Sequence, residues 1–95
     1  LGTPPLEGDA LVALYANIDK AWQLENNLVL VRKYKFKDFK EALDFVNRVG
    51  EIAEAQGHHP DIELGWGRVI VKLTTHKIKG LSRNDFIMAA RLDAI

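Results

Sequence analysis

Apolar residues recur at helical spacing in three parts of the chain. A stripe of this kind, repeated every three or four positions, predicts a helix that buries one face against a core. Asp38 followed by Glu41 has the pattern of a capped helix N-terminus, and Gly57 suits a helix C-terminus. Ser82 and Asp85 form a second N-terminal pair of the same type. We therefore expect helices over residues 7–19, 39–56 and 85–95.

Between these helices the apolar spacing shortens to two residues, the period of a strand with one buried face. Asn26 and Asn27 separate the first two extended runs, and asparagine tolerates the positive φ of a tight turn. Arg32 interrupts the apolar face of the second run, and we expect its charged end to reach solvent at a sheet edge. A second hairpin is expected to turn at Gly65–Gly67. The strands should lie on either side of the asparagine pair within residues 21–36, and then at 61–66 and 68–76.

The order of these elements is α-β-β-α-β-β-α, which predicts the α+β class. We expect a four-stranded antiparallel sheet with three helices packed on one face. The 95 residues suffice for a single domain over residues 1–95, in which LGTPP (1–5) is expected to be a disordered lead-in. Because the core is small, self-association would add stability, and VIVKL (69–73) is the candidate apolar sheet edge.

Composition narrows the classes of function. The 13 basic and 13 acidic residues give a formal net charge of zero, which argues against direct nucleic-acid binding as the main function. The absence of cysteine excludes disulfides, thiolate catalysis and thiolate metal sites, and it is compatible with a reducing cytoplasm, where we place the protein. No apolar run approaches the roughly 18 residues of a membrane span, and no signal peptide is visible.

The three histidines are the main candidates for chemistry. If the second hairpin turns near residues 66–67, the numbers of paired residues sum to about 133–134, and His76 returns to the level of residues 57–58. Asp85 opens the next helix soon after His76, and Glu54 lies one helical turn before His58. We therefore expect one end of the sheet to gather His58, His59, His76, Asp85 and Glu54, rimmed by Trp66 or by other aromatic residues.

Imidazole groups suit proton transfer near neutral pH, because their reference pKa is about 6.5. Two imidazoles and a carboxylate would support general acid–base catalysis, in which each proton-transfer group contributes about 100- to 10,000-fold. The chain has no cysteine, no serine or threonine in a nucleophile elbow, and no glycine-rich phosphate loop.

Each candidate also has a purely structural interpretation. The adjacent histidines can act as favourable partners of the helix C-terminal dipole, and Asp85 can act only as a helix cap. Trp66 can be a half-buried turn residue, while His76 and Glu54 can be solvated. A zinc site is less favoured, because adjacent histidines on an extended segment diverge and no HExxH-type spacing is present.

The spacing of these residues resembles the signature of the pterin-4a-carbinolamine dehydratases. The resemblance covers about residues 6–94, and it includes the segments YKFKDFKEALDFVNRVGEIAE and VKLTTHKIKGLSRNDFIMAARLD. The family often has small residues after its third histidine, whereas this chain has Lys77-Ile78-Lys79-Gly80, a departure that would change access to the site. The matching signature reads Glu54-x3-His58-His59-Pro60-x5-Trp66-x9-His76-x8-Asp85.

The resemblance implies a hydro-lyase, a 4a-hydroxytetrahydrobiopterin dehydratase. Its substrate is a 4a-hydroxytetrahydropterin, its product is a quinonoid dihydropterin, and its role is tetrahydrobiopterin biosynthesis and recycling, with no cofactor and no metal. The resemblance assigns proton transfer to His58 and His76 without settling which is the acid, and it assigns orientation of the ring to His59. Asp85 would hold an imidazole in one tautomer or contact the pterin. The remaining substrate-binding or supporting residues are Glu54, Pro60 and Trp66.

The resemblance also implies that the chain forms a homodimer or homotetramer and has no direct contact with nucleic acid or membrane. Two alternatives remain open. One is a non-catalytic interaction module, such as the dimerisation cofactor of a transcription regulator. The other is a dehydratase-like protein that acts on other pterins, such as molybdopterin intermediates. The intact histidine signature favours the enzyme, because a scaffold has no need of three aligned histidines.

Overall fold

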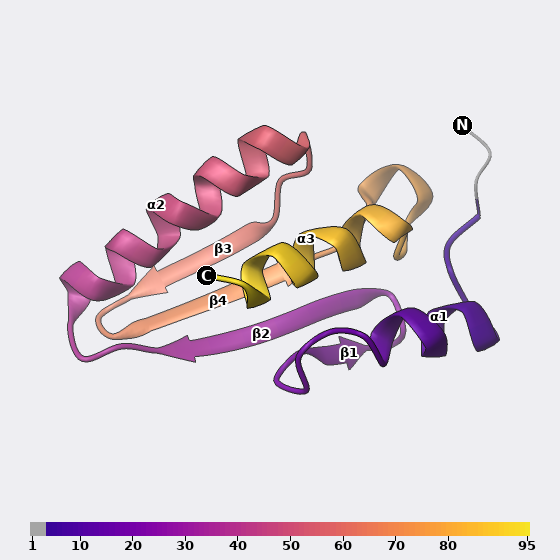
Figure 1. Cartoon of the computed structure of the whole chain (residues 1–95), viewed down its shortest axis with the longest axis horizontal. Coiled ribbons are helices and arrows are strands. Elements are labelled where there is room, and N and C mark those ends of the chain that lie inside the picture. Colours follow the sequence, from indigo (N-terminus) through magenta and orange to yellow (C-terminus); the bar gives the residue numbers. More distant parts are fainter. Residues whose placement is uncertain (1–3) are drawn as a thin grey trace.

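The computed structural model describes residues 4–95 and shows the predicted order α-β-β-α-β-β-α (Figure 1). A short 3-10 helix, η1, precedes the last α-helix. The helices are α1 (Gly8–Tyr15), α2 (Phe39–Gln56), η1 (His76–Ile78) and α3 (Arg83–Asp93), and the strands are β1 (Gln23–Glu25), β2 (Val29–Lys35), β3 (Asp61–Gly65) and β4 (Arg68–Leu73). None of the helices in the described residues is long and apolar enough to cross a membrane.

The four strands form one antiparallel sheet in the order β1-β2-β4-β3. Strand β4 therefore lies inside the sheet and pairs with a strand on each side, so the prediction that VIVKL forms a sheet edge is wrong. Its apolar character reflects this central position, since Val69, Val71 and Leu73 are fully buried. The edges of the sheet are β1 and β3.

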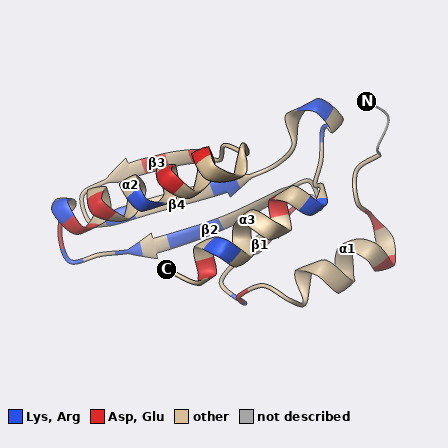
Figure 2. Cartoon of the chain, turned by 45° about the horizontal axis from the view of Figure 1, so that its top comes forward, with Lys and Arg blue, Asp and Glu red and all other residues tan. Residues whose placement is uncertain are grey.

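The core lies between the sheet and the helices that cover one of its faces. Figure 1 shows α2 and α3 running across the same side of the sheet. Val49 of α2 and Met88 of α3 are fully buried in one cluster with residues of β2 and β4. The alternate positions of β2 include the exposed Lys33 and Lys35, and Figure 2 shows basic residues along this strand. This alternation is the two-residue period of a sheet with one buried face.

The structure shifts several of the predicted boundaries, including both ends of the last helix, which is Arg83–Asp93 in place of 85–95. The first helix ends at Tyr15, although Ile18 beyond it is still buried. Strand β4 ends at Leu73, before the predicted end at residue 76. Thr75 then pairs with Gly80, its N–H donating to the Gly80 carbonyl at 2.8 Å, so that the residues between them form a closed loop around η1.

The described N-terminal segment packs against this loop. The Leu6 N–H donates to the Leu81 carbonyl at 2.8 Å. A Cβ atom on Gly80 would lie 2.7 Å from Cβ of Pro5, so the close approach of Pro5 requires glycine at this position. Residues 1–3 of the expected lead-in lie outside the described residues, whereas Pro4 and Pro5 are placed.

Arg32 does not extend to solvent at a sheet edge, so that prediction is wrong. Strand β2 is an inner strand, and the Arg32 Nη1 atom lies 2.7 Å from Oδ1 of Asp93 at the end of α3. Asp93 also accepts hydrogen bonds from the Trp22 indole N–H at 2.8 Å and from the Asp19 backbone N–H at 2.9 Å. Arg32, Asp93, Trp22 and Asp19 are here called the Asp93 cluster. In this cluster the sheltered guanidinium of Arg32 has the carboxylate of Asp93 as its partner, as a sheltered charge requires.

Candidate active site

The register of the second hairpin brings the histidine segments to one end of the sheet. Asp61 pairs with Lys72 and Gly65 pairs with Arg68, so the residue numbers sum to 133, within the predicted range. If this register is extended past the strand ends, residue 57 lies opposite residue 76. Consistent with this, the His76 Nε2 atom lies 3.9 Å from Oδ2 of Asp61, the first residue of β3.

The end of α2 sets the position of His58. Gly57 has a φ of 65°, the left-handed conformation that ends a helix. The His58 N–H then donates to the Ala53 carbonyl at 3.2 Å, which turns the chain back across the last helical turn. The His58 side chain is 15% exposed, and its Nε2 atom lies 2.5 Å from Oδ1 of Asp85. His58 is therefore a sheltered imidazole with a carboxylate partner.

Asp85 lies in the first turn of α3 and is fully buried. With Ser82 it forms the predicted capping box, in which the Ser82 N–H donates to Asp85 Oδ2 at 2.9 Å. The hydroxyl of Thr75 donates to the same oxygen at 2.7 Å. The helix N-terminus adds a favourable dipole for a negative charge. Asp85 thus caps the helix and holds His58 at the same time, so its structural and functional interpretations are compatible.

The other two histidines are exposed. The His59 Nε2 atom lies 2.5 Å from Oε2 of Glu54, in the last part of α2, and the His59 side chain is 62% exposed. The His76 side chain is 76% exposed, and its distance of 3.9 Å from Asp61 is too long for a hydrogen bond. Pro60 lies between His59 and the start of β3 and is partly buried. Among residues 4–95 no hydrogen bond joins one imidazole to another.

Trp66 does not rim the histidines. It lies in the turn between β3 and β4 and is 73% exposed. The turn that returns His76 to the level of residues 57–58 necessarily puts Trp66 at the opposite end of the strand pair. The structure therefore corrects the expectation that this side chain borders the site.

Two polar residues at the histidine end were missed by the sequence analysis. Thr75 hydrogen-bonds Asp85, and Asp61 faces His76. One signal was present for Thr75, which continues the alternating face of Val69 and Leu73 with a hydroxyl in place of an apolar group. Its contact with Asp85 depends on the loop between β4 and α3, and no periodicity encodes that loop.

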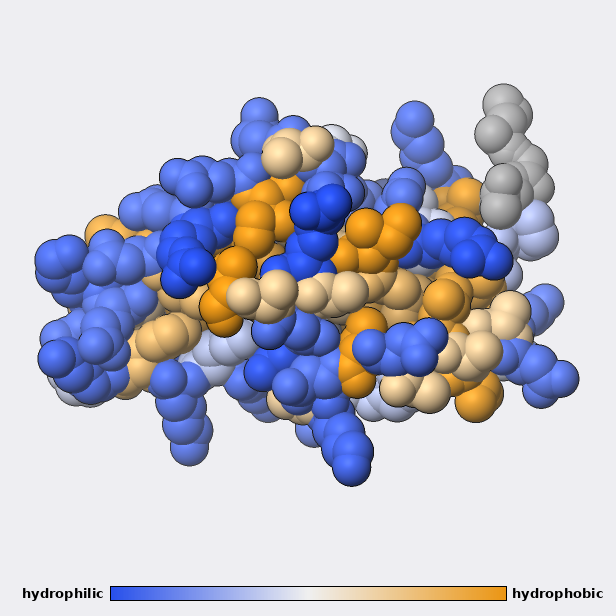
Figure 3. Space-filling model, in the orientation of Figure 1, coloured by the Kyte–Doolittle hydropathy of each residue, from blue (hydrophilic) through white to orange (hydrophobic). Residues whose placement is uncertain are grey.

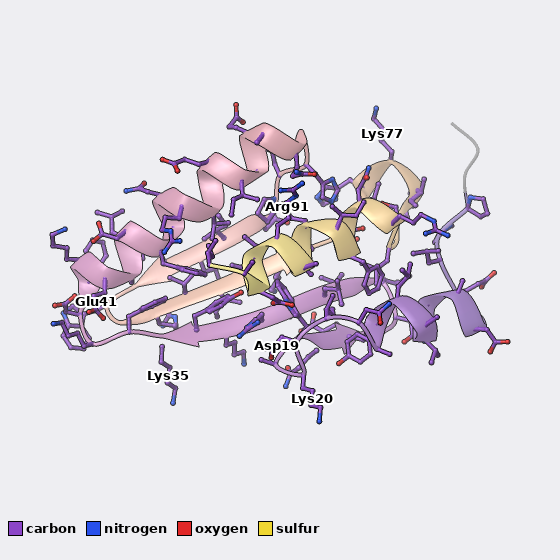
Figure 4. All side chains as sticks on the ribbon, in the orientation of Figure 1. Asp19, Lys20, Lys35, Glu41, Lys77 and Arg91 are labelled. Atoms are coloured by element: carbon purple, nitrogen blue, oxygen red, sulfur yellow. The ribbon has the colours of Figure 1, made fainter. Side chains whose placement is uncertain are left out.

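The loop after His76 projects from the molecule. Figure 4 shows the Lys77 side chain pointing away from the other elements, and Lys79 is also exposed. Lys79 has a positive φ of 55°, which closes η1. The two lysines of this loop therefore add charge next to His76 without covering it.

A separate cavity of about 200 Å³ lies between α1 and α3. Leu14, Ile18, Phe86 and Ile87 line it, together with Asn17, Arg83 and Ala90. Figure 3 shows apolar side chains reaching the surface around these helices, in agreement with the 47% exposure of Ile87. In the part of the chain that the structure describes, no group of three His, Cys, Asp or Glu residues is placed to hold a metal ion.

Comparison with known proteins identifies the family. A family described as pterin 4 alpha carbinolamine dehydratase matches residues 4–95. The chain belongs to the pterin-4a-carbinolamine dehydratase family. A relative named for this dehydratase from Alkaliphilus metalliredigens is 48% identical over 93 residues, which cover 98% of this chain and 84% of the relative. Another from Rubrobacter xylanophilus is 49% identical over 94 residues, which cover 99% of this chain and 87% of the relative.

Two solved structures share the fold of this chain. A transcriptional coactivator/pterin dehydratase from Brucella melitensis superposes with a TM-score of 0.85 at 31% identity, covering 95% of this chain and 96% of that one. A pterin dehydratase-like protein identified as a RuBisCO assembly factor in the α-carboxysome has a TM-score of 0.62 at 23% identity, covering 77% and 83%. The second likeness concerns the fold alone.

Proposed function

We propose that this dehydratase-family chain is a hydro-lyase that converts a 4a-hydroxytetrahydropterin into a quinonoid dihydropterin, and so supports tetrahydrobiopterin recycling. The observation that carries the proposal is the sheltered pair of His58 and the fully buried Asp85 in a member of this family. In the reaction the C4a–O bond breaks, the hydroxyl takes up a proton and leaves as water, and N5 of the pterin loses its proton. The step therefore needs an acid and a base at one site.

The histidines divide these tasks by their surroundings. In the proposal His58 and His76 exchange protons with the pterin, because one is held by Asp85 and the other is open to solvent at the same end of the sheet. His59 orients the pterin ring, supported by Glu54, and Pro60 fixes the chain between His59 and β3. Trp66 has no part in this proposal, because it lies at the other end of the hairpin.

Substitution of the two proton-transfer residues tests the proposal. We expect His58→Ala and His76→Ala each to lower the rate of dehydration about tenfold or more, since each removes a proton-transfer group. The rate is measured by stopped-flow on a 4a-carbinolamine formed in situ, with circular dichroism to establish that the fold persists. Lys20→Ala is the control, because this exposed residue lies in the loop before β1 (Figure 4). Near-normal turnover in both histidine variants would contradict the proposal.

A role as an interaction module is the second candidate. It is favoured by the Brucella melitensis structure, which is described as a transcriptional coactivator as well as a pterin dehydratase. In that case partner binding would survive His58→Ala while dehydration is lost. A variant that loses turnover and still restores the function of the protein in cells would therefore favour the module over the enzyme.

We also propose that the chain forms a homodimer or a homotetramer. Within residues 4–95 no strand covers the outer edge of β3. On α2, Phe39 and Leu43 are large apolar residues with substantial exposure, and they lie four positions apart on one side of the helix. Burying these surfaces between copies of the chain would enlarge a core that is small in a 95-residue protein.

A further inference from the structure

The buried carboxylate of Asp85 has more partners than the pairing with His58 requires. Its Oδ1 atom faces His58 Nε2 at 2.5 Å. Its Oδ2 atom accepts from the Thr75 hydroxyl at 2.7 Å and from the Ser82 N–H at 2.9 Å. The Ser82 contact belongs to the helix cap, whereas Thr75 comes from the segment after β4 and is not one of the two residues of the capping box. The role of the Thr75 hydroxyl is therefore open.

The directions of these hydrogen bonds follow from the chemistry of the groups. An ionised carboxylate can only accept, so Thr75 donates its single hydroxyl proton to Asp85. The Thr75 oxygen then accepts from the Ser82 hydroxyl, which lies 2.7 Å away. The Asp85 backbone N–H donates to the Ser82 backbone carbonyl at 3.1 Å. This arrangement leaves no donor or acceptor of the three side chains in conflict.

The Thr75 side chain is itself held in place. Its backbone N–H donates to the Gly80 carbonyl at 2.8 Å, in the bridge that closes the loop around η1. A β-branched side chain has few χ1 rotamers, and the hydrogen bonds of the Thr75 hydroxyl with Ser82 and Asp85 select one of them. The hydroxyl thus sets the plane of the Asp85 carboxylate from the side opposite its contact with His58.

We propose that Thr75 is a positioning residue, whose hydroxyl orients the Asp85 carboxylate so that His58 keeps its proton on Nε2 and leaves Nδ1 free to accept a proton. Facing a carboxylate oxygen, His58 Nε2 must donate, and this defines the tautomer of the neutral ring. Among the hydrogen bonds of residues 4–95, none involves Nδ1 of His58. The catalytic part of this inference, that Nδ1 serves as the base, depends on the proposed dehydratase function, whereas the tautomer does not.

The test compares three threonine variants of the full chain. Thr75→Val removes the hydroxyl at nearly constant volume, and Thr75→Ser keeps it. Thr74→Val is the matched control, since the Thr74 hydroxyl contacts the Leu28 carbonyl at 2.8 Å and the Gly80 carbonyl at 3.3 Å but does not contact Asp85. The first readout is the ¹⁵N chemical shifts of the His58 ring, which distinguish the two neutral tautomers. The second is the pH dependence of kcat and KM for a 4a-carbinolamine formed in situ.

We expect Thr75→Val to give a mixture of His58 tautomers and to lower kcat about tenfold with little change in KM, because proton-transfer geometry is lost while pterin binding remains. Thr75→Ser and Thr74→Val should keep the wild-type tautomer and a kcat within about twofold of wild type. An unchanged His58 tautomer in folded Thr75→Val would overturn the inference. Equal loss of activity in all three variants would also overturn it, because this would indicate a general effect on the fold.

The two readouts separate this inference from the proposed function. If the wild-type protein does not dehydrate the pterin, the proposed function fails, and the tautomer measurement still decides whether Thr75 positions His58. If the wild-type protein is active and Thr75→Val has wild-type kcat and the wild-type tautomer, the dehydratase proposal stands and the positioning role of Thr75 is refuted.

Discussion

At the scale of single residues, the three histidines differ in how far water reaches them. The side chain of His58 is 15% exposed, compared with 62% for His59 and 76% for His76. An imidazole sheltered beside a carboxylate keeps one orientation, whereas an exposed imidazole is free to change rotamer. His58 is therefore the most sheltered of the three, and its carboxylate partner is fully buried, whereas Glu54 beside His59 is exposed.

Tyr34 provides a prediction at the same scale. Burial is the largest cause that raises the pKa of Tyr34 from 10.0 to about 12, although the neighbouring Arg32 guanidinium opposes the rise. Because the folded pKa is above the unfolded one, this contribution to stability is fully present below pH 10 and is lost as the pH rises toward about 12. Urea unfolding across this range should show the loss in the wild-type protein and a smaller loss in Tyr34→Phe. Identical alkaline profiles for the two proteins would contradict the assignment.

The sequence could predict where the histidines lie along the sheet but not how deeply each is buried. Residue spacing and the hairpin register were enough to bring His58, His76 and Asp85 to one end. The depth of His58 depends on α3 packing above the sheet, and the contact of Asp85 with Thr75 depends on an irregular loop. The prediction for Trp66 was wrong because it placed the hairpin turn beside the histidines. The register of the hairpin puts its turn and the histidines at opposite ends of the strand pair.

At the scale of elements, the Asp93 cluster joins segments that are distant in sequence. Asp93 ends α3, Arg32 lies in β2, and Trp22 and Asp19 belong to the segment before β1. Strand and helix positions were predicted well because their apolar periods are strong. The two-residue period of β2 does not show whether a charged residue on its inner face has a partner. Arg32 is that residue, and its partner Asp93 lies 61 residues further along the chain. The sequence therefore favoured a sheet edge for Arg32.

Removing the charge of Asp93 should destabilise the fold. Asp93→Asn removes the nearer counter-charge of the sheltered Arg32 guanidinium and leaves only Asp19, whose Oδ1 atom lies 3.8 Å away, so we expect the free energy of unfolding to fall by about 2 kcal/mol. Asp44→Asn is the control, because its ion pair with Lys40 is exposed and should change the same quantity by less than about 0.5 kcal/mol. Both values come from urea unfolding at neutral pH. Equal effects of the two substitutions would show that the Asp93 cluster does not tie α3 to the sheet.

At the scale of the whole molecule, the order of elements was enough to predict the fold class. It was not enough to predict which strands pair with one another. The order α-β-β-α-β-β-α and helices on one face of an antiparallel sheet were predicted and are confirmed. The position of β4 between β2 and β3 was not predicted, because an apolar strand is compatible with an edge that another copy covers or with the interior of the sheet. Only the structure distinguishes these two explanations of VIVKL.

The proposed oligomer is tested by its mass in solution. Sedimentation equilibrium at micromolar concentration should give a mass of two or four chains, because exposed Phe39 and Leu43 and the outer edge of β3 are candidates for burial between copies. Phe39→Lys should weaken the association while leaving the fold intact, since Phe39 lies at the start of α2 and outside the buried core. A mass of one chain for the wild-type protein would contradict the proposal.

The most direct test of the dehydratase account is turnover by the purified wild-type chain. A 4a-carbinolamine formed in situ should lose water faster when the protein is added, and a metal chelator should leave the rate unchanged, because the proposed proton transfers use only histidine side chains. Dehydration at the rate of the uncatalysed reaction would contradict the account. So would a rate that the chelator abolishes and added metal restores.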